Sequence, residues 1–134
     1  MSLMLLSALS AAQAGDVVIR LDGVQTDGAP LVLRVFATEE TYPHWGEEVR
    51  SLTVPASSAT IEMRVSDLAP GRYGFTIHHD HDADGELDFA FLPPGPSEGT
   101  AASCTKKPLM APRWSNCSVQ VPADGAELHL PMWY

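Results

Sequence analysis

Apolar and polar residues alternate with a period of two in short segments along most of the chain, and this pattern restricts the fold more than any other feature. The strands predicted from it cover residues 16–24, 31–38, 49–54, 60–68, 72–80, 86–92, 117–121 and 127–134. Successive side chains of a strand point to opposite faces of its sheet, so each of these segments has one face for a core and one for water. Gly, Pro and Asp separate the segments, and helical periodicity is almost missing. The pattern predicts an all-β protein, an antiparallel sandwich or barrel.

The first 14 residues, MSLMLLSALSAAQA, are apolar or small, carry no charge and end in Ala12-Gln13-Ala14. Signal peptidase cuts after such a small-x-small pattern, and the segment is too short to span a bilayer. We expect residues 1–14 to be a signal peptide, residues 15–134 to form one domain without a transmembrane segment, and the protein to be exported to the periplasm or secreted. The alternative is a buried N-terminal helix or strand, although no polar face interrupts the segment and it stops at a cleavage-like site.

The formal net charge is −9, and the basic residues are scattered along the chain. A polyanion would be repelled over most of such a surface, so we expect no nucleic-acid partner. The charge leaves the true partner unknown, with an envelope or extracellular ligand as the expectation for an exported protein.

Two cysteines, Cys104 and Cys117, are present, and they do not form a Cys-x-x-Cys motif. In an exported protein they predict one disulfide, which would tie down part of the long irregular segment 93–115. Two free thiols are the alternative if the leader is not a leader.

The stretch HHDHDADGELDF, residues 78–89, places acids at alternate positions before and after Gly85. This spacing matches the first nine positions of the DxDxDG calcium loop, in which carboxylates aim at one point and the glycine allows a sharp reversal. The predicted calcium ligands, counting one backbone carbonyl, are Asp80, Asp82, Asp84, Glu86 and Asp88.

The twelfth position of the calcium loop departs from the pattern, because it holds Phe91 where a bidentate glutamate is usual. The flanking segments also read as strands and not as helices. We therefore expect a weak structural calcium site, with Glu98 or water supplying the last oxygens. A solvated acidic turn without an ion is the alternative.

The histidines of the same stretch allow a transition-metal site instead, since imidazole binds zinc, copper and nickel. His78 and His79 are adjacent, so on a strand they point to opposite faces. We expect His79 to continue the core face and His78 to face solvent, so at most two histidines could converge. Such a site needs His78 or His79 to meet His81 and a further ligand.

Two other functions remain open. A sugar or peptide could stack on aromatic side chains at the loop end, where Trp45, Trp114, His78 and His81 would face the ligand. Adjacent carboxylates could also act as an acid–base pair, but no nucleophile motif accompanies them. We expect a binding protein and not an enzyme.

The segment DLAPGRYGFTIHHDHDADGELD, together with Pro96, Glu98, Gly99 and Ser103, resembles the exported proteins catalogued as domain of unknown function 2141. The LAPGRY strand is also similar to strands of prealbumin-like and collagen-binding B-type domains. The resemblance implies an exported immunoglobulin-like or prealbumin-like β-sandwich of about seven to eight strands, and it implies no established activity.

Overall fold

The computed structural model describes residues 15–81, 89–90, 95–96, 99–104 and 112–134. Its elements in chain order are β1 (Gly15–Asp22), β2 (Pro30–Phe36), β3 (Arg50–Pro55), β4 (Ile61–Leu68), β5 (Gly71–His79), β6 (Phe89–Ala90), β7 (Gly95–Pro96), β8 (Thr100–Ala102), α2 (Trp114–Cys117), β9 (Ser118–Val121) and β10 (Ala126–Pro131).

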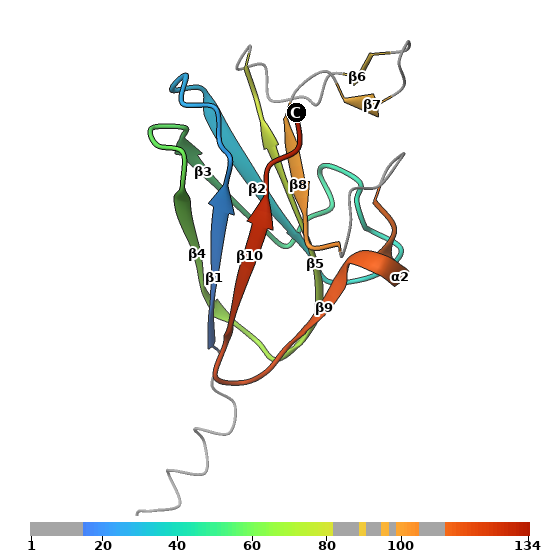
Figure 1. Ribbon diagram of the computed structural model, residues 1–134. Coiled ribbons are helices and arrows are strands. Elements are labelled where there is room, and N and C mark those ends of the chain that lie inside the picture. Colours follow the sequence, from blue (N-terminus) through green and yellow to red (C-terminus); the bar gives the residue numbers. More distant parts are fainter. Residues whose placement is uncertain (1–14, 82–88, 91–94, 97–98, 105–111) are drawn as a thin grey trace, which may run out of the picture.

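Two sheets face each other (Figure 1), one with the order β10-β1-β4 and the other with the order β3-β2-β5-β8. Strand β9 also pairs with β5, beside Gly71–Gly74, and β8 continues along β5 at Thr76–His78. The predicted sandwich of about eight strands is thereby confirmed. One pairing differs from the expected antiparallel order, because β1 and β10 run parallel.

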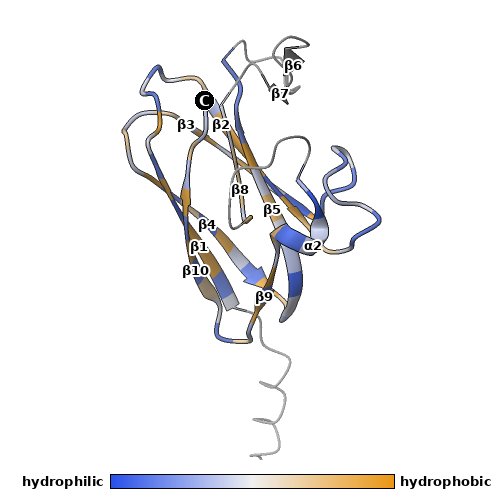
Figure 2. Cartoon of the chain, turned by 45° about the vertical axis from the view of Figure 1, so that its right-hand side comes forward, coloured by the Kyte–Doolittle hydropathy of each residue, from blue (hydrophilic) through white to orange (hydrophobic). Residues whose placement is uncertain are grey.

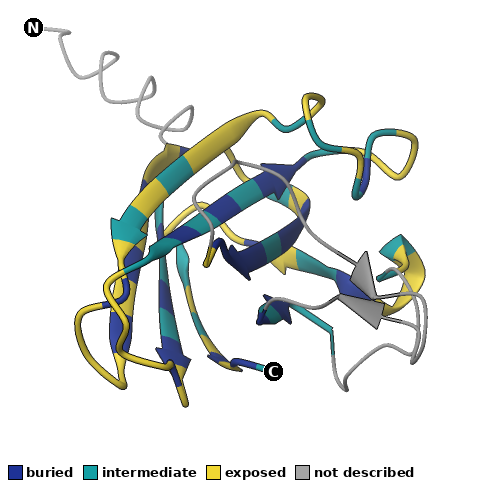
Figure 3. Cartoon of the chain, turned by 90° about the horizontal axis from the view of Figure 1, so that it is seen from above, coloured by how far each residue is buried: buried dark blue, intermediate teal, exposed yellow. Residues whose placement is uncertain are grey.

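The alternation of the sequence becomes the alternation of burial. In β4, Ile61, Met63 and Val65 face the space between the sheets, while Glu62 and Arg64 face water. Banded burial along the strands is visible in Figure 3, and Figure 2 shows hydrophobic residues mainly along the strands. Each large apolar side chain taken out of water contributes about 1.5–3 kcal/mol, so this face drives the packing of the sheets.

The two sheets are also joined at their edges. On one side, the Arg50 guanidinium of β3 donates to the carbonyls of Ser66 and Asp67, both at 2.7 Å. On the other side, Thr100 and Trp133 exchange two backbone hydrogen bonds of 2.8 and 2.7 Å. This second link anchors the end of the chain beside β5.

A second, smaller apolar cluster covers the outer face of the five-stranded sheet. Phe36 and Tyr42 are buried there with ring centroids 5.4 Å apart, and Trp114 packs edge-on against Tyr42. Gly74 leaves room for this packing, since a Cβ at that position would overlap the Tyr42 ring. Trp45 also packs against this cluster and, like Tyr42, lies in the connection between β2 and β3.

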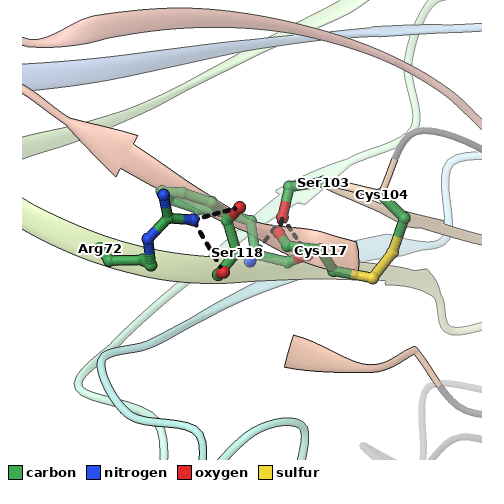
Figure 4. The surroundings of a disulfide bond; sticks show 6 residues. Arg72, Ser103, Cys104, Cys117 and Ser118 are labelled. Atoms are coloured by element: carbon green, nitrogen blue, oxygen red, sulfur yellow. Dashed lines mark hydrogen bonds between the residues drawn. A yellow bond between two sulfur atoms is a disulfide. The ribbon is translucent and has the colours of Figure 1, made fainter. Parts of the chain in front are cut away.

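The predicted disulfide between Cys104 and Cys117 is confirmed and lies in this cluster. Figure 4 shows Ser103 beside it, where its hydroxyl donates to the Cys117 carbonyl and accepts from the Phe75 N–H. Part of the segment that was expected to be irregular is strand β8, whose Thr-Ala-Ala sequence has no alternation from which to recognise it. Its strand conformation depends on pairing with β5.

Candidate metal site at the end of strand β5

Three side chains that could hold a metal ion meet where β5 ends: Asp27, His79 and His81. His79 Nε2 lies 2.7 Å from Asp27 Oδ1, and His81 Nδ1 lies 2.7 Å from Asp27 Oδ2. One ligand atom from each residue lies within 4.8 Å of the other two. His79 is fully buried, while the side chains of His81 and Asp27 are 32% and 43% exposed, so solvent reaches the cluster from one side.

The pairing of β2 with β5 brings Asp27 to the histidines. Leu31 lies opposite His79 in the register, and the Asp80 N–H donates to the Pro30 carbonyl. The connection from β1 to β2 therefore ends directly beside the end of β5. His79 itself continues the inward face of Phe75 and Ile77, as the alternation predicts.

Hydrogen bonds made by the β1–β2 connection, one of them to the residue after β3, hold the Asp27 carboxylate in position. The Ala29 N–H donates to Asp27 Oδ1 at 3.0 Å, and the Gly28 N–H donates to the Ala56 carbonyl. Gly28 has φ +80°, a left-handed conformation that glycine adopts without a steric penalty. The carboxylate is therefore presented to the histidines before any ligand arrives.

The electrostatic environment favours the protonation states that bind metal. The Ala29 N–H, and then the two imidazoles, lower the pKa of Asp27 to about 2, so it is ionised at neutral pH. Burial lowers the pKa of His79, an effect that its hydrogen bond to Asp27 offsets only in part. An ionised carboxylate and a neutral imidazole are the forms that coordinate a cation.

Two imidazoles and one carboxylate form a mixed nitrogen and oxygen donor set. Ligands at about 2.0–2.1 Å from a tetrahedral zinc ion lie about 3.3 Å apart, so the three groups would separate slightly to admit an ion. Such a set suits zinc and the neighbouring transition metals, whereas calcium prefers six to eight oxygens.

Residues 19–129 match the family described as "Uncharacterized protein conserved in bacteria (DUF2141)". The chain belongs to this family. The resemblance identified from the LAPGRY strand and the acidic turn is thus confirmed, and the matched region contains all three residues of the cluster. No curated protein and no solved structure matches the chain.

His78 of this DUF2141 domain is buried, so the prediction that it faces solvent is wrong. It points to the outer face, as alternation requires, but Trp45 stacks on its ring with centroids 4.5 Å apart. Arg34 approaches from the neighbouring strand, with Nη1 3.3 Å from His78 Nδ1 and its guanidinium carbon 3.9 Å from the Trp45 ring centroid. A connection distant in sequence covers the histidine, which strand periodicity alone cannot reveal.

The side chains predicted to face a sugar or peptide do not all lie on one surface. Trp45 and Trp114 are half-buried and pack against Phe36 and the disulfide on the outer face of the five-stranded sheet. The two tryptophans therefore do not join His81 in one ligand-facing surface.

Of the predicted calcium ligands, Asp80 is described and is buried at the end of β5. The remaining predicted ligands, all outside the described residues, are Asp82, Asp84, Glu86, Asp88 and Glu98. The calcium loop stays a prediction from the sequence.

Asp27 is the residue that the sequence analysis missed. It lies in the segment QTDGAP between the first two predicted strands, where an isolated aspartate carries no motif. The only local signal is Asp-Gly, which indicates a turn.

Within the part of the chain that the structure describes, no helix is both long enough and apolar enough to cross a bilayer.

Proposed function

We propose that this DUF2141 domain is an exported protein that binds a divalent transition metal ion, zinc in the first instance, through Asp27, His79 and His81. The observation that carries the proposal is the approach of two imidazole nitrogens to the two oxygens of one carboxylate, each at 2.7 Å. This develops the histidine-based alternative of the sequence analysis, with His79 meeting His81 and Asp27 as the third ligand. The role is binding, without a catalytic step.

Three protein ligands leave one position of a tetrahedral ion open. His81 and Asp27 are partly exposed, so an ion would enter from the solvent side, while buried His79 anchors the inner side. A site with an open position exchanges its ion or adds a ligand from another molecule more readily than a closed site with four protein ligands. The arrangement suits a protein that carries or delivers a metal ion.

The Cys104–Cys117 disulfide supports an exported location, because disulfides persist in oxidising compartments and are rare in the cytosol. The leader-like residues 1–14 support the same location. The proposal therefore places metal binding in the periplasm or outside the cell.

The test is a zinc titration of residues 15–134, measured by calorimetry and by competition with a chromophoric chelator. We expect one zinc ion per chain, with binding weakened at least tenfold in His81→Gln and in Asp27→Asn. His129→Gln and Asp124→Asn are matched controls, because both residues are exposed and neither belongs to the cluster. Equal zinc affinity in all five proteins, or no binding in the wild type, would reject the site.

Magnesium and calcium serve as competing ions in the same titration. A ligand set with two imidazoles predicts that millimolar calcium leaves zinc binding unchanged. Displacement of zinc by calcium would mean that the site prefers hard cations and that the proposed metal class is wrong. Calcium binding to the wild type that weakens in His81→Gln would mean the same.

A further inference from the structure

We propose that Tyr134 is a positioning residue of this site, whose hydroxyl selects Nε2 of His79 as the nitrogen that meets the metal ion. The inference rests on the proposed metal binding and assigns a role to Tyr134, which is not one of the three proposed ligands. Tyr134 Oη lies 2.8 Å from His79 Nδ1 and accepts a hydrogen bond of 2.9 Å from the Gln25 N–H. It thus touches both the strand that carries His79 and the connection that carries Asp27.

The metal-free hydrogen bonds determine which tautomer His79 adopts. The ionised Asp27 carboxylate only accepts, and its Oδ1 lies 2.7 Å from His79 Nε2, so Nε2 carries the proton of the neutral imidazole. Nδ1 is then an acceptor, and the Tyr134 hydroxyl donates to it. Every polar atom of the buried imidazole is satisfied in this state.

Metal binding at Nε2 requires the opposite tautomer, because the nitrogen must offer its lone pair. The imidazole proton then resides on Nδ1, and Nδ1–H donates to Tyr134 Oη. The oxygen has capacity for this bond, since the Gln25 N–H occupies one of its two lone pairs. The hydroxyl proton turns to solvent, which reaches this side chain because Tyr134 is 43% exposed.

The hydroxyl can therefore exchange donor and acceptor roles without moving. A backbone carbonyl at the same place could accept from Nδ1–H but could not donate in the metal-free state. Partners of this kind orient metal-binding histidines, and their removal commonly weakens metal affinity by about 10–100-fold.

Backbone contacts, and not the tyrosine ring alone, place the hydroxyl. The paired hydrogen bonds between Thr100 and Trp133 hold Trp133, the residue before Tyr134, against β8. The Met132 N–H donates to the Asp22 carbonyl. Gly99 leaves the space that the tyrosine ring fills, because a Cβ there would overlap it. The Gly99 carbonyl also accepts from the His79 N–H at 2.8 Å, so ring and histidine are held by the same stretch of backbone.

The test compares Tyr134→Phe with Tyr73→Phe in residues 15–134. Both lose one tyrosine hydroxyl, but the Tyr73 hydroxyl donates to the Ala69 carbonyl and does not touch the site. We expect zinc affinity to fall about 10–100-fold in Tyr134→Phe and to stay within twofold of wild type in Tyr73→Phe. Gly99→Ala, which keeps the hydroxyl but displaces the ring, should resemble Tyr134→Phe.

Nitrogen-15 NMR of the histidine rings separates positioning from general stabilisation. In wild type, zinc should shift the His79 proton from Nε2 to Nδ1, and Tyr134→Phe should lose the single well-defined Nδ1–H state. Affinity within twofold of wild type in Tyr134→Phe, or equal losses in both tyrosine variants, would overturn the positioning role while leaving the metal site intact. Absence of zinc binding to the wild type would instead reject the proposed function itself.

Discussion

His78 and His79 are adjacent in β5 and are both buried, yet they lie on opposite faces of the same sheet. His79 lies on the inward face and contacts Asp27 and Tyr134, whereas Trp45 covers His78 on the outer face. The two imidazoles therefore cannot act as one ligand pair, and the functional reading of the histidine run depends on which neighbour each meets.

Replacement of Trp45 by alanine should uncover the outer-face cluster around His78. Trp45 contacts His78 by stacking and Arg34 through its ring face, and it is half-buried. We expect a loss of about 2–3 kcal/mol in the free energy of unfolding, below the cost of a fully buried tryptophan. Urea unfolding measures it, with exposed Val49→Ala as the control that should change by less than about 0.5 kcal/mol. A loss as small as that of the control would mean that Trp45 does not cover the sheet.

The stability of the metal-free protein should depend on pH through His79. Burial lowers its pKa from the ordinary value of 6.5, so between these two values the unfolded chain binds more protons than the folded one. The stabilising contribution is full above pH 6.5 and is lost as the pH falls through the lowered pKa. His79→Gln should flatten the fall of the unfolding free energy between about pH 7.5 and 5 when EDTA is present. A slope in His79→Gln equal to that of the wild type would contradict the assignment.

Removal of the disulfide should destabilise the domain by about 3 kcal/mol, the chain-entropy value for a short loop. Cys104 and Cys117 are separated by 13 positions, and Cys117 is almost fully buried. Thermal melting of Cys104→Ala/Cys117→Ala against the oxidised wild type measures the effect. A reductant should lower the melting temperature of the wild type and leave that of the double variant unchanged; a shift of equal size in both would assign the effect to something other than this bond.

Gly74→Ala should cost about 1–3 kcal/mol through overpacking. The added Cβ would overlap the Tyr42 ring, which is held between Phe36 and Trp114. The matched test is a double-mutant cycle with Tyr42→Leu, because a smaller side chain relieves the overlap. The two changes should be clearly less costly together than the sum of their separate costs, and strict additivity would show that the glycine is not needed for this contact.

Calcium binding to the acidic turn stays a prediction that a thermal melt can check. With a dissociation constant of about 0.1 mM, about 1 mM calcium would stabilise the domain by about 1.4 kcal/mol. The shift should vanish in Asp84→Asn and persist in His81→Gln, since Asp84 belongs to the predicted calcium ligands and His81 to the proposed zinc site. If the zinc shift instead persists in Asp84→Asn and vanishes in His81→Gln, the protein has two independent metal sites. If calcium gives no shift, the turn is a polar loop without a bound ion.

The sequence by itself determined the long strands β1, β2, β4 and β5 and their inward faces. Alternation assigns β4 and the inward run Tyr73, Phe75 and Ile77 correctly, because burial of every second side chain is a local consequence of strand geometry. The disulfide was equally readable, since only Cys104 and Cys117 can pair. The family could be identified because most of the residues that carry the resemblance form one contiguous motif.

Only the tertiary structure decided what gathers at the end of β5. Asp27 and His81 are 54 positions apart in the sequence, and Tyr134 is 55 positions from His79. The parallel pairing of β1 with β10 and the short strand β8 belong to the same class of facts, because each depends on which segments meet across the sheets. Periodicity specifies the face on which a side chain lies, and the pairing of distant strands specifies the partner it finds there.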